Sequence, residues 1–203
     1  MRNFGRDPGA GPGGPTRGPI FGFGMPLPPM VKRLLIANFT LFLLPLLPGV
    51  DEALLRAWFA LVPAEVFAEG RIWQLGTYMF LHGSFVHIAV NMLMLWMFGS
   101  SVEMHWGSRP FLWYYLVCGL GGALTQWITG PSSEAAVVGA SAAVLGVIVA
   151  FAMIDPDRYV YIYFLFPVKV KYLVWFLVVV DLLAAFSGQQ TRIANFAHLG
   201  LSR

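Results

Sequence analysis

The 203-residue chain has little charge and almost no cysteine. Charged residues make up 11% and hydrophobic residues 58% of it, whereas about a quarter of a typical globular domain is charged. Long stretches without a charge exclude an ordinary soluble domain and indicate that lipid surrounds most of the chain. The single cysteine, Cys118, excludes an intramolecular disulfide. The net charge is only +3. The basic residues flank apolar runs and form no basic face, so nucleic acid is not an expected partner.

The N-terminal segment differs from the rest of the sequence. Residues 1–30 are rich in glycine and proline and have too few apolar residues to form a core, so we expect a disordered tail. The segment is no secretory signal peptide, because no uninterrupted apolar stretch follows its basic start. Residues 31–203 are predicted to form one membrane domain.

Apolar runs in that domain predict an all-α polytopic membrane protein with six spans. The segment between the first two spans, 51–73, mixes charges with tryptophan and phenylalanine, which is typical of a segment lying in the membrane interface. The sixth span begins at Phe196, and we expect it to be truncated at the chain end, Arg203. The other spans are expected at 34–50, 85–100, 111–129, 139–154 and 170–185.

Lysine and arginine in the short loops predict the orientation of these spans, because they are enriched on the cytoplasmic side. The side opposite the tail has only Arg56, Arg71 and Arg192. The N-terminus is therefore expected in the cytoplasm, and a bacterial cytoplasmic membrane suits the compact domain. The tail side carries Arg2, Arg6, Arg17, Lys32, Arg33, Arg109, Arg158, Lys169 and Lys171.

This topology brings several polar residues to the outer half of the membrane. His87 and Asn91 are four residues apart and share a helix face, and His82 lies just before their span. Ser141 stands at the start of the fourth span, and His198 lies at the same depth. A serine hydroxyl becomes a nucleophile when a neutral imidazole takes its proton, and asparagine or histidine side chains can stabilise a developing oxyanion.

Less specific interpretations apply to the same residues. Ser141 can serve helix packing alone, and His87 and Asn91 can form interhelical hydrogen bonds. The spacing of His82 and His87 suits a metal or haem poorly, and the sequence shows no third ligand, so no metal or cofactor is expected. Asp181, an acid within a predicted span, is a functional candidate whose role stays open.

Taken together, the motifs resemble those of the rhomboid intramembrane serine proteases. The resemblance covers about residues 73–200 and implies a six-helix bundle. It also implies a dyad of Ser141 and His198, and oxyanion donors from His87, Asn91 and Ser141. His82, Gly139 and Ala140 would support the site. The motifs are HGSFVHIAVN from His82 to Asn91, a Glu103–Gly107–Ser108 run, GASAAVLG around Ser141, and AHLG around His198.

The resemblance implies an endopeptidase that cleaves transmembrane or membrane-anchored proteins. Two positions depart from the family pattern, because Ala142 follows the serine where glycine is commonest and Leu201 replaces a glycine. The alternative is a non-catalytic rhomboid-like protein, or an inactive truncated form, that binds membrane segments. Such relatives usually lack the serine or the histidine, and this chain keeps both. A transporter or channel is disfavoured, because paired intramembrane charges and inverted repeats are missing from the sequence.

Overall fold

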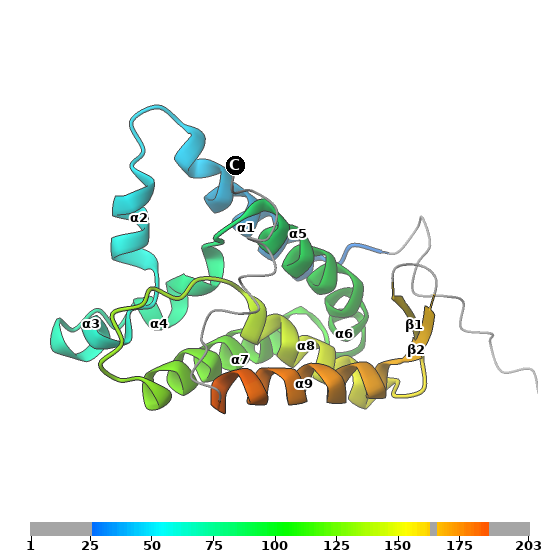
Figure 1. Ribbon diagram of the computed structural model, residues 1–203. Coiled ribbons are helices and arrows are strands. Elements are labelled where there is room, and N and C mark those ends of the chain that lie inside the picture. The colour runs from blue at the N-terminus through cyan, green and yellow to red at the C-terminus, as the bar shows by residue number, and fades with distance from the viewer. Residues whose placement is uncertain (1–25, 163–165, 187–203) are drawn as a thin grey trace, which may run out of the picture.

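The computed structural model describes residues 26–162 and 166–186, which are mostly helical (Figure 1). Most of the predicted tail and the whole sixth span lie outside these residues. In chain order the elements are α1 (Pro29–Leu43), η1 (Leu44–Leu46), α2 (Glu52–Phe59), α3 (Pro63–Ala68), α4 (Gln74–Thr77), η2 (Tyr78–Phe80), α5 (Phe85–Met94), the π-helical η3 (Leu95–Gly99), α6 (Ser100–Trp106), α7 (Ser108–Thr129), α8 (Ser141–Ile154), β1 (Tyr159–Ile162), β2 (Phe166–Lys169) and α9 (Val170–Phe186).

Helix α1 begins at Pro29, inside the segment that the sequence assigned to the tail. Proline suits the first helical position, because its missing N–H would have no helical partner there and its φ is already fixed near the helical value. Leu44 then starts the short 3₁₀ turn η1, with Pro45 as its second residue, where the apolar span ends. Together α1 and η1 form an apolar segment of 18 residues. Its length of roughly 27 Å is close to the thickness of the hydrocarbon layer.

A buried carboxylate from another helix caps the start of α1. Glu103 in α6 is 2% exposed and accepts hydrogen bonds from the backbone N–H groups of Met30, at 2.9 Å, and Val31, at 2.7 Å. The hydroxyl of Ser108 donates to the same carboxylate at 2.5 Å. Negative charge is favourable at a helix N-terminus. Glu103 therefore joins the start of α1 to the turn between α6 and α7.

The second predicted span is longer than the sequence suggested. Helices α5, η3 and α6 form one continuous segment of 22 residues, Phe85–Trp106. It ends at Gly107, whose φ of 87° is accessible to glycine at no steric cost. Among the described residues, Pro29–Leu46 and Phe85–Trp106 are long and apolar enough to cross a bilayer, whereas the apolar parts of α8 and α9 are shorter. The number of spans therefore stays a prediction.

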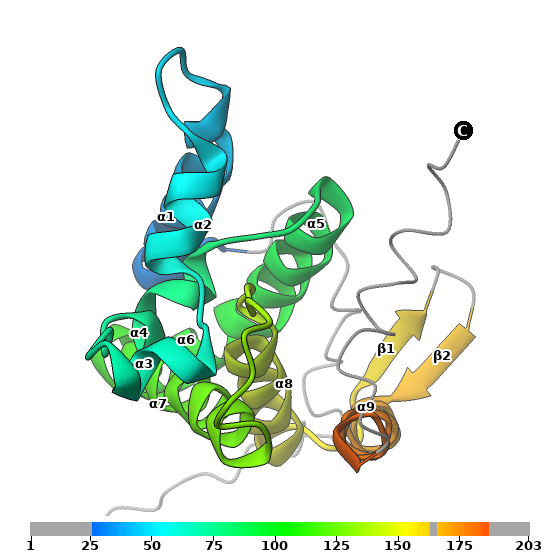
Figure 2. The ribbon, with the colours of Figure 1, turned by 60° about the vertical axis from the view of Figure 1, so that its left-hand side comes forward.

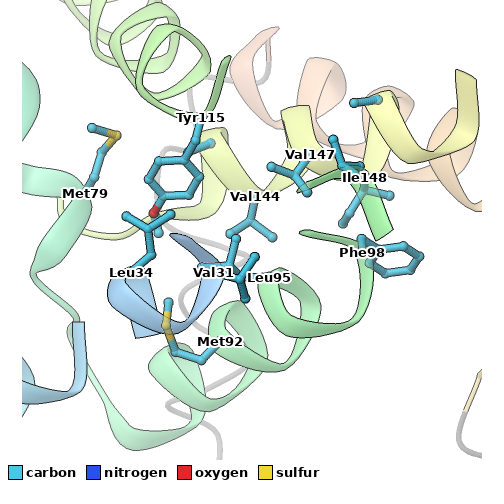
Figure 3. Packing of buried hydrophobic residues seen from close by; sticks show 14 of the residues in the cluster. Val31, Leu34, Met79, Met92, Leu95, Phe98, Tyr115, Val144, Val147 and Ile148 are labelled. Atoms are coloured by element: carbon cyan, nitrogen blue, oxygen red, sulfur yellow. The ribbon is translucent and has the colours of Figure 1, made fainter. Parts of the chain in front are cut away.

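Helix α8 forms the centre of the described core. It packs between α7 and α9 and against η3, an arrangement visible from two sides (Figures 1 and 2). Small residues allow α7 and α8 to approach closely, and the hydroxyl of Tyr114 donates to the Gly146 carbonyl at 2.9 Å. Apolar side chains from four parts of the chain meet here, including Val31, Met92, Leu95, Phe98, Tyr115, Val144, Val147 and Ile148 (Figure 3).

Two short helices, α2 and α3, lie in the segment predicted to lie in the interface, and α4 follows directly after it. Asp51 caps α2 by accepting hydrogen bonds from the N–H groups of Ala53 and Leu54. The Arg71 guanidinium pairs with Glu65 at 2.7 Å and lies 5.2 Å from the ring centre of Trp58. These contacts give the segment a defined structure.

Two short antiparallel strands lie between α8 and α9, an element that the sequence did not predict within the mostly helical fold. Strands β1 and β2 are antiparallel, with Tyr159 opposite Lys169. The β-forming composition of YVYI favours a strand over a loop. Beside the hairpin, hydrogen bonds from Lys171 and then Lys169 hold the pKa of Asp157 below its usual range. The sequence analysis counted these lysines for orientation alone.

Candidate active site

Ser141 is the first residue of α8, as the topology predicted. The segment before it is extended, because Val137 exchanges two backbone hydrogen bonds with Leu61 in the interfacial segment. Ala140 is fully buried and Ser141 is exposed. The chain therefore enters α8 through a turn that is attached to the interfacial segment and leaves the Ser141 side chain accessible.

Gly139 gives this turn its shape. Its φ is 126°, a value that side-chain-bearing residues rarely adopt. Its N–H donates to the carbonyl of Tyr78 at 3.0 Å. The hydroxyl of Tyr78 in turn donates to the Gly119 carbonyl in α7 at 2.7 Å. Tyr78 thus links the turn before Ser141 to α7 through two hydrogen bonds. The sequence did not predict this role, because nothing in it distinguishes Tyr78 from the neighbouring aromatic residues.

The structure brings His87 to the same turn. A Cβ added to Gly139 would lie 2.6 Å from His87 Cε1 and 2.7 Å from its Nε2, so the imidazole occupies the space of the missing side chain. His87 is held in the first turn of α5, whose N-cap Ser84 accepts the His87 N–H at 3.2 Å. His87 is 54 positions from Ser141 in the sequence, and its ring packs against a residue only two positions before Ser141.

Asn91 lies one turn further along α5. Its side chain is 6% exposed, and its Nδ2 donates to the His87 carbonyl at 3.1 Å. This contact fixes the amide on the helix face that carries His87. One N–H and the side-chain oxygen remain for other partners.

His82 packs directly against His87. The two ring centres are 5.1 Å apart and the planes meet at 66°, an edge-to-face arrangement. His82 is 6% exposed, and among the described residues neither ring nitrogen has a partner at ordinary hydrogen-bond geometry. His82 lies before α5 and His87 lies within it. The chain bends between them, and this bend lets two rings five residues apart come into contact.

Of the other two candidate residues, the structure describes the position of Asp181 but not that of His198. His198 lies outside the described residues, so the Ser141–His198 dyad stays a prediction. Asp181 lies in α9. In the described part of the chain, no three histidine, cysteine, aspartate or glutamate side chains gather as a possible metal site.

Comparison with known proteins identifies the family. The Rhomboid domain matches residues 69–200, more than half of the chain. The chain belongs to the rhomboid family. The match includes the end of the interfacial segment, His82, His87 and the Ser141 turn. Membership makes this chain an integral membrane protein with a polytopic helical fold, in a family of serine proteases and non-catalytic relatives.

Three relatives illustrate the similarity. Rhomboid protease GluP of Bacillus subtilis is 32% identical over 112 residues, which are 55% of this chain and 22% of that protein. RHOMBOID-like protein 12, mitochondrial, of Arabidopsis thaliana is 31% identical over 156 residues, 69% of this chain and 46% of that protein. Putative rhomboid protease YdcA of Bacillus subtilis is 31% identical over 118 residues, 58% of each chain. This rhomboid therefore spans less than two thirds of each of these relatives.

Proposed function

We propose that this rhomboid is an intramembrane serine endopeptidase. The observation that carries the proposal is the position of Ser141, exposed at the start of α8 beside the glycine against which His87 packs. In the proposed reaction, Ser141 Oγ attacks the scissile carbonyl carbon while the imidazole of His198 takes its proton. The protonated imidazole then gives that proton to the leaving amine, and water hydrolyses the acyl-enzyme with the same base.

The oxyanion of the tetrahedral intermediate needs hydrogen-bond donors in place before it forms. His87 and Asn91 are the proposed side-chain donors, together with the N–H of Ser141. The hydrogen-bonded Asn91 amide and the half-buried His87 ring that packs on Gly139 support this assignment, since both are held by contacts within the fold. Gly139, Ala140 and His82 then act as supporting residues that set the shape of the turn and of the His87 ring.

The proposed substrates are transmembrane or membrane-anchored proteins. The lysine and arginine pattern supports an N-terminus in the cytoplasm and a Ser141 that faces the outer side. A bacterial cytoplasmic membrane is the proposed location, and the matched relatives come from bacterial and mitochondrial sources.

Two readouts test the proposal on the full 203-residue chain in liposomes. The first is cleavage of a transmembrane reporter protein, and the second is labelling by a fluorophosphonate, which reacts with activated serines. Both are expected to be present in the unaltered chain and absent in Ser141→Ala. The matched control is Ser132→Ala, which removes an exposed serine hydroxyl from the loop before α8 and should leave both readouts unchanged.

A second variant, His198→Ala, tests the base. It should abolish labelling and cleavage together, because the serine loses its activation. A folded chain that neither cleaves nor labels would overturn the proposal and favour the non-catalytic role. Labelling that persists in Ser141→Ala would show that another serine is the nucleophile.

A further inference from the structure

Two lysines meet one carboxylate where strand β2 continues into α9. The ammonium of Lys169 donates to Asp157 Oδ1 at 3.2 Å, and that of Lys171 donates to the same oxygen at 2.7 Å. The two ammonium groups are therefore neighbours, and one negative charge faces two positive ones. This cluster, called the lysine pair below, has a net positive charge.

The lysine pair can bind a further anion. An ammonium has three N–H donors, and within the described part of the chain each of these two uses one donor, on Asp157. Their side chains are 33% and 38% exposed, so a ligand from outside the protein can reach the remaining donors. A phosphate group, with several acceptor oxygens and a negative charge, matches them.

Aromatic rings surround the lysine pair. The Lys171 ammonium lies 5.5 Å from the ring centre of Tyr172, and the Lys169 ammonium lies 5.8 Å from that of Tyr159. Both tyrosines are exposed. Because tyrosine and tryptophan are enriched where a membrane meets water, these surroundings are typical of the headgroup level of a bilayer.

An exposed apolar stripe begins beside the lysine pair and follows α9. Its members recur at positions i, i+3, i+4 and i+7 and so share one helix face. The stripe runs away from the lysines for roughly 10 Å, a length that suits the first part of an acyl chain. Its residues are Tyr172, Trp175, Phe176 and Val179, which are 61%, 69%, 63% and 47% exposed.

The place of the lysine pair in the fold indicates which side of the membrane it faces. Strands β1 and β2 lie at the end of the molecule opposite to α2 and α3, as two views show (Figures 1 and 2). The pair is thus on the other membrane face from the interfacial segment. In the proposed orientation this is the cytoplasmic face, whose leaflet contains anionic lipids.

We propose that the lysine pair and the α9 stripe together bind one anionic phospholipid. Its phosphate accepts hydrogen bonds from Lys169 and Lys171, and one acyl chain lies along the stripe. The stripe alone would suit any hydrophobic partner, whereas the lysines beside its first residue favour a partner with an anion at that level. A zwitterionic lipid is disfavoured, because its ammonium would face two lysines and a carboxylate that they already share.

This inference does not depend on the proposed protease activity, since it needs only a chain embedded in a bilayer. The test places the full chain in phosphatidylcholine vesicles with a trace of phosphatidylglycerol that carries a diazirine in one acyl chain. A parallel sample uses phosphatidylcholine with the same diazirine. After irradiation, adducts are mapped by mass spectrometry. The vesicles contain no substrate protein, so adducts on the stripe report lipid alone.

Phosphatidylglycerol should give about fivefold more adducts on the stripe than phosphatidylcholine, as expected for one net charge near the surface. High salt should reduce this excess. On α7, where Trp113 and Val117 are also exposed, the two lipids should give equal yields. Ser141→Ala should retain the excess on the stripe, which separates this site from catalysis.

Two variants change the charge of the lysine pair in opposite directions. Lys169→Gln with Lys171→Gln should abolish the excess, whereas Asp157→Asn should raise it about another fivefold, because it removes the competing carboxylate. The matched control is Lys32→Gln with Arg33→Gln, which removes two exposed charges from α1 and should leave the excess unchanged.

Equal adduct yields from the two lipids on the stripe of the unaltered chain would overturn the proposal. An excess that persists without both lysines would do the same. A loss of equal size in the α1 control would show a general effect of basic charge on the lipid near the protein, and no site at the lysine pair.

Discussion

The imidazole of His87 occupies the space that a side chain at Gly139 would fill, with Cε1 2.6 Å from the position of an added Cβ. The start of α5 and the turn before α8 both carry proposed catalytic groups. They pack together here because Gly139 has no side chain. Gly139 also has a φ of 126°, so steric contact and backbone conformation both require glycine here. Substitutions at this contact should therefore impair the site more strongly than they impair the rest of the fold.

We predict that Gly139→Ala lowers the proposed cleavage rate by at least about tenfold, because His87 must move to admit the methyl group. It should also destabilise the protein by about 1–3 kcal/mol through backbone strain. Gly121→Ala is the control, since a Cβ there meets nothing within 4 Å. Reporter cleavage and thermal unfolding in detergent measure the two effects. Full activity of Gly139→Ala would contradict the role of this contact.

His87→Ala tests the oxyanion assignment directly. Loss of one donor to an oxyanion typically costs about 10²–10³ in kcat, and we expect that loss with a smaller change in KM. His87→Gln retains an N–H donor and should keep more activity. The control is His105→Ala, an exposed histidine at the other end of the same helical segment. A raised KM with an unchanged kcat in both His87 variants would indicate a role in substrate binding instead.

Glu103→Ala should lower the free energy of unfolding more than the replacement of an exposed carboxylate by alanine does. It leaves the partly buried N–H of Met30 and the buried N–H of Val31 without their acceptor, at an expected cost of about 2–4 kcal/mol. Glu103→Gln preserves an acceptor oxygen and should lose less. Glu134→Ala, in an exposed loop, serves as the control. Unfolding free energies from denaturant titration check the order; equal stabilities for Glu103→Ala and Glu134→Ala would refute the capping role.

The contact between α7 and α8 allows a methyl-exchange test. A Cβ at Gly122 would lie 2.3 Å from the Cβ of Ala142, so Gly122→Ala should cost about 1–3 kcal/mol through overpacking. The double variant Gly122→Ala with Ala142→Gly moves the methyl group from one helix to the other and should recover at least half of that loss. Unfolding free energies of the two single variants and the double variant give the coupling. Additive losses would show that the two residues are not in contact.

The sequence alone predicted much of the helical organisation. Long apolar runs have few alternatives to helices in lipid, because every backbone polar group must be paired within the segment. The helices of the second to fifth predicted spans accordingly lie where these runs are. The ends were less predictable: Pro29 starts α1 early because a distant residue, Glu103, completes its cap. The hairpin before α9 was missed, since its short strands carry no helix-like or span-length signal.

The sequence also determined the family, and its motifs were enough to propose Ser141, His87, Asn91 and His82 as site residues, because their order and spacing form a specific pattern. Only the tertiary structure decided how these residues meet. The His87 ring packs on Gly139, the edge of one histidine contacts the other, and Tyr78 supports the turn before Ser141. Such contacts join parts of the chain that are far apart in sequence, and close packing of whole helices sets their distances. The spacing of residues within any one helix carries no record of them.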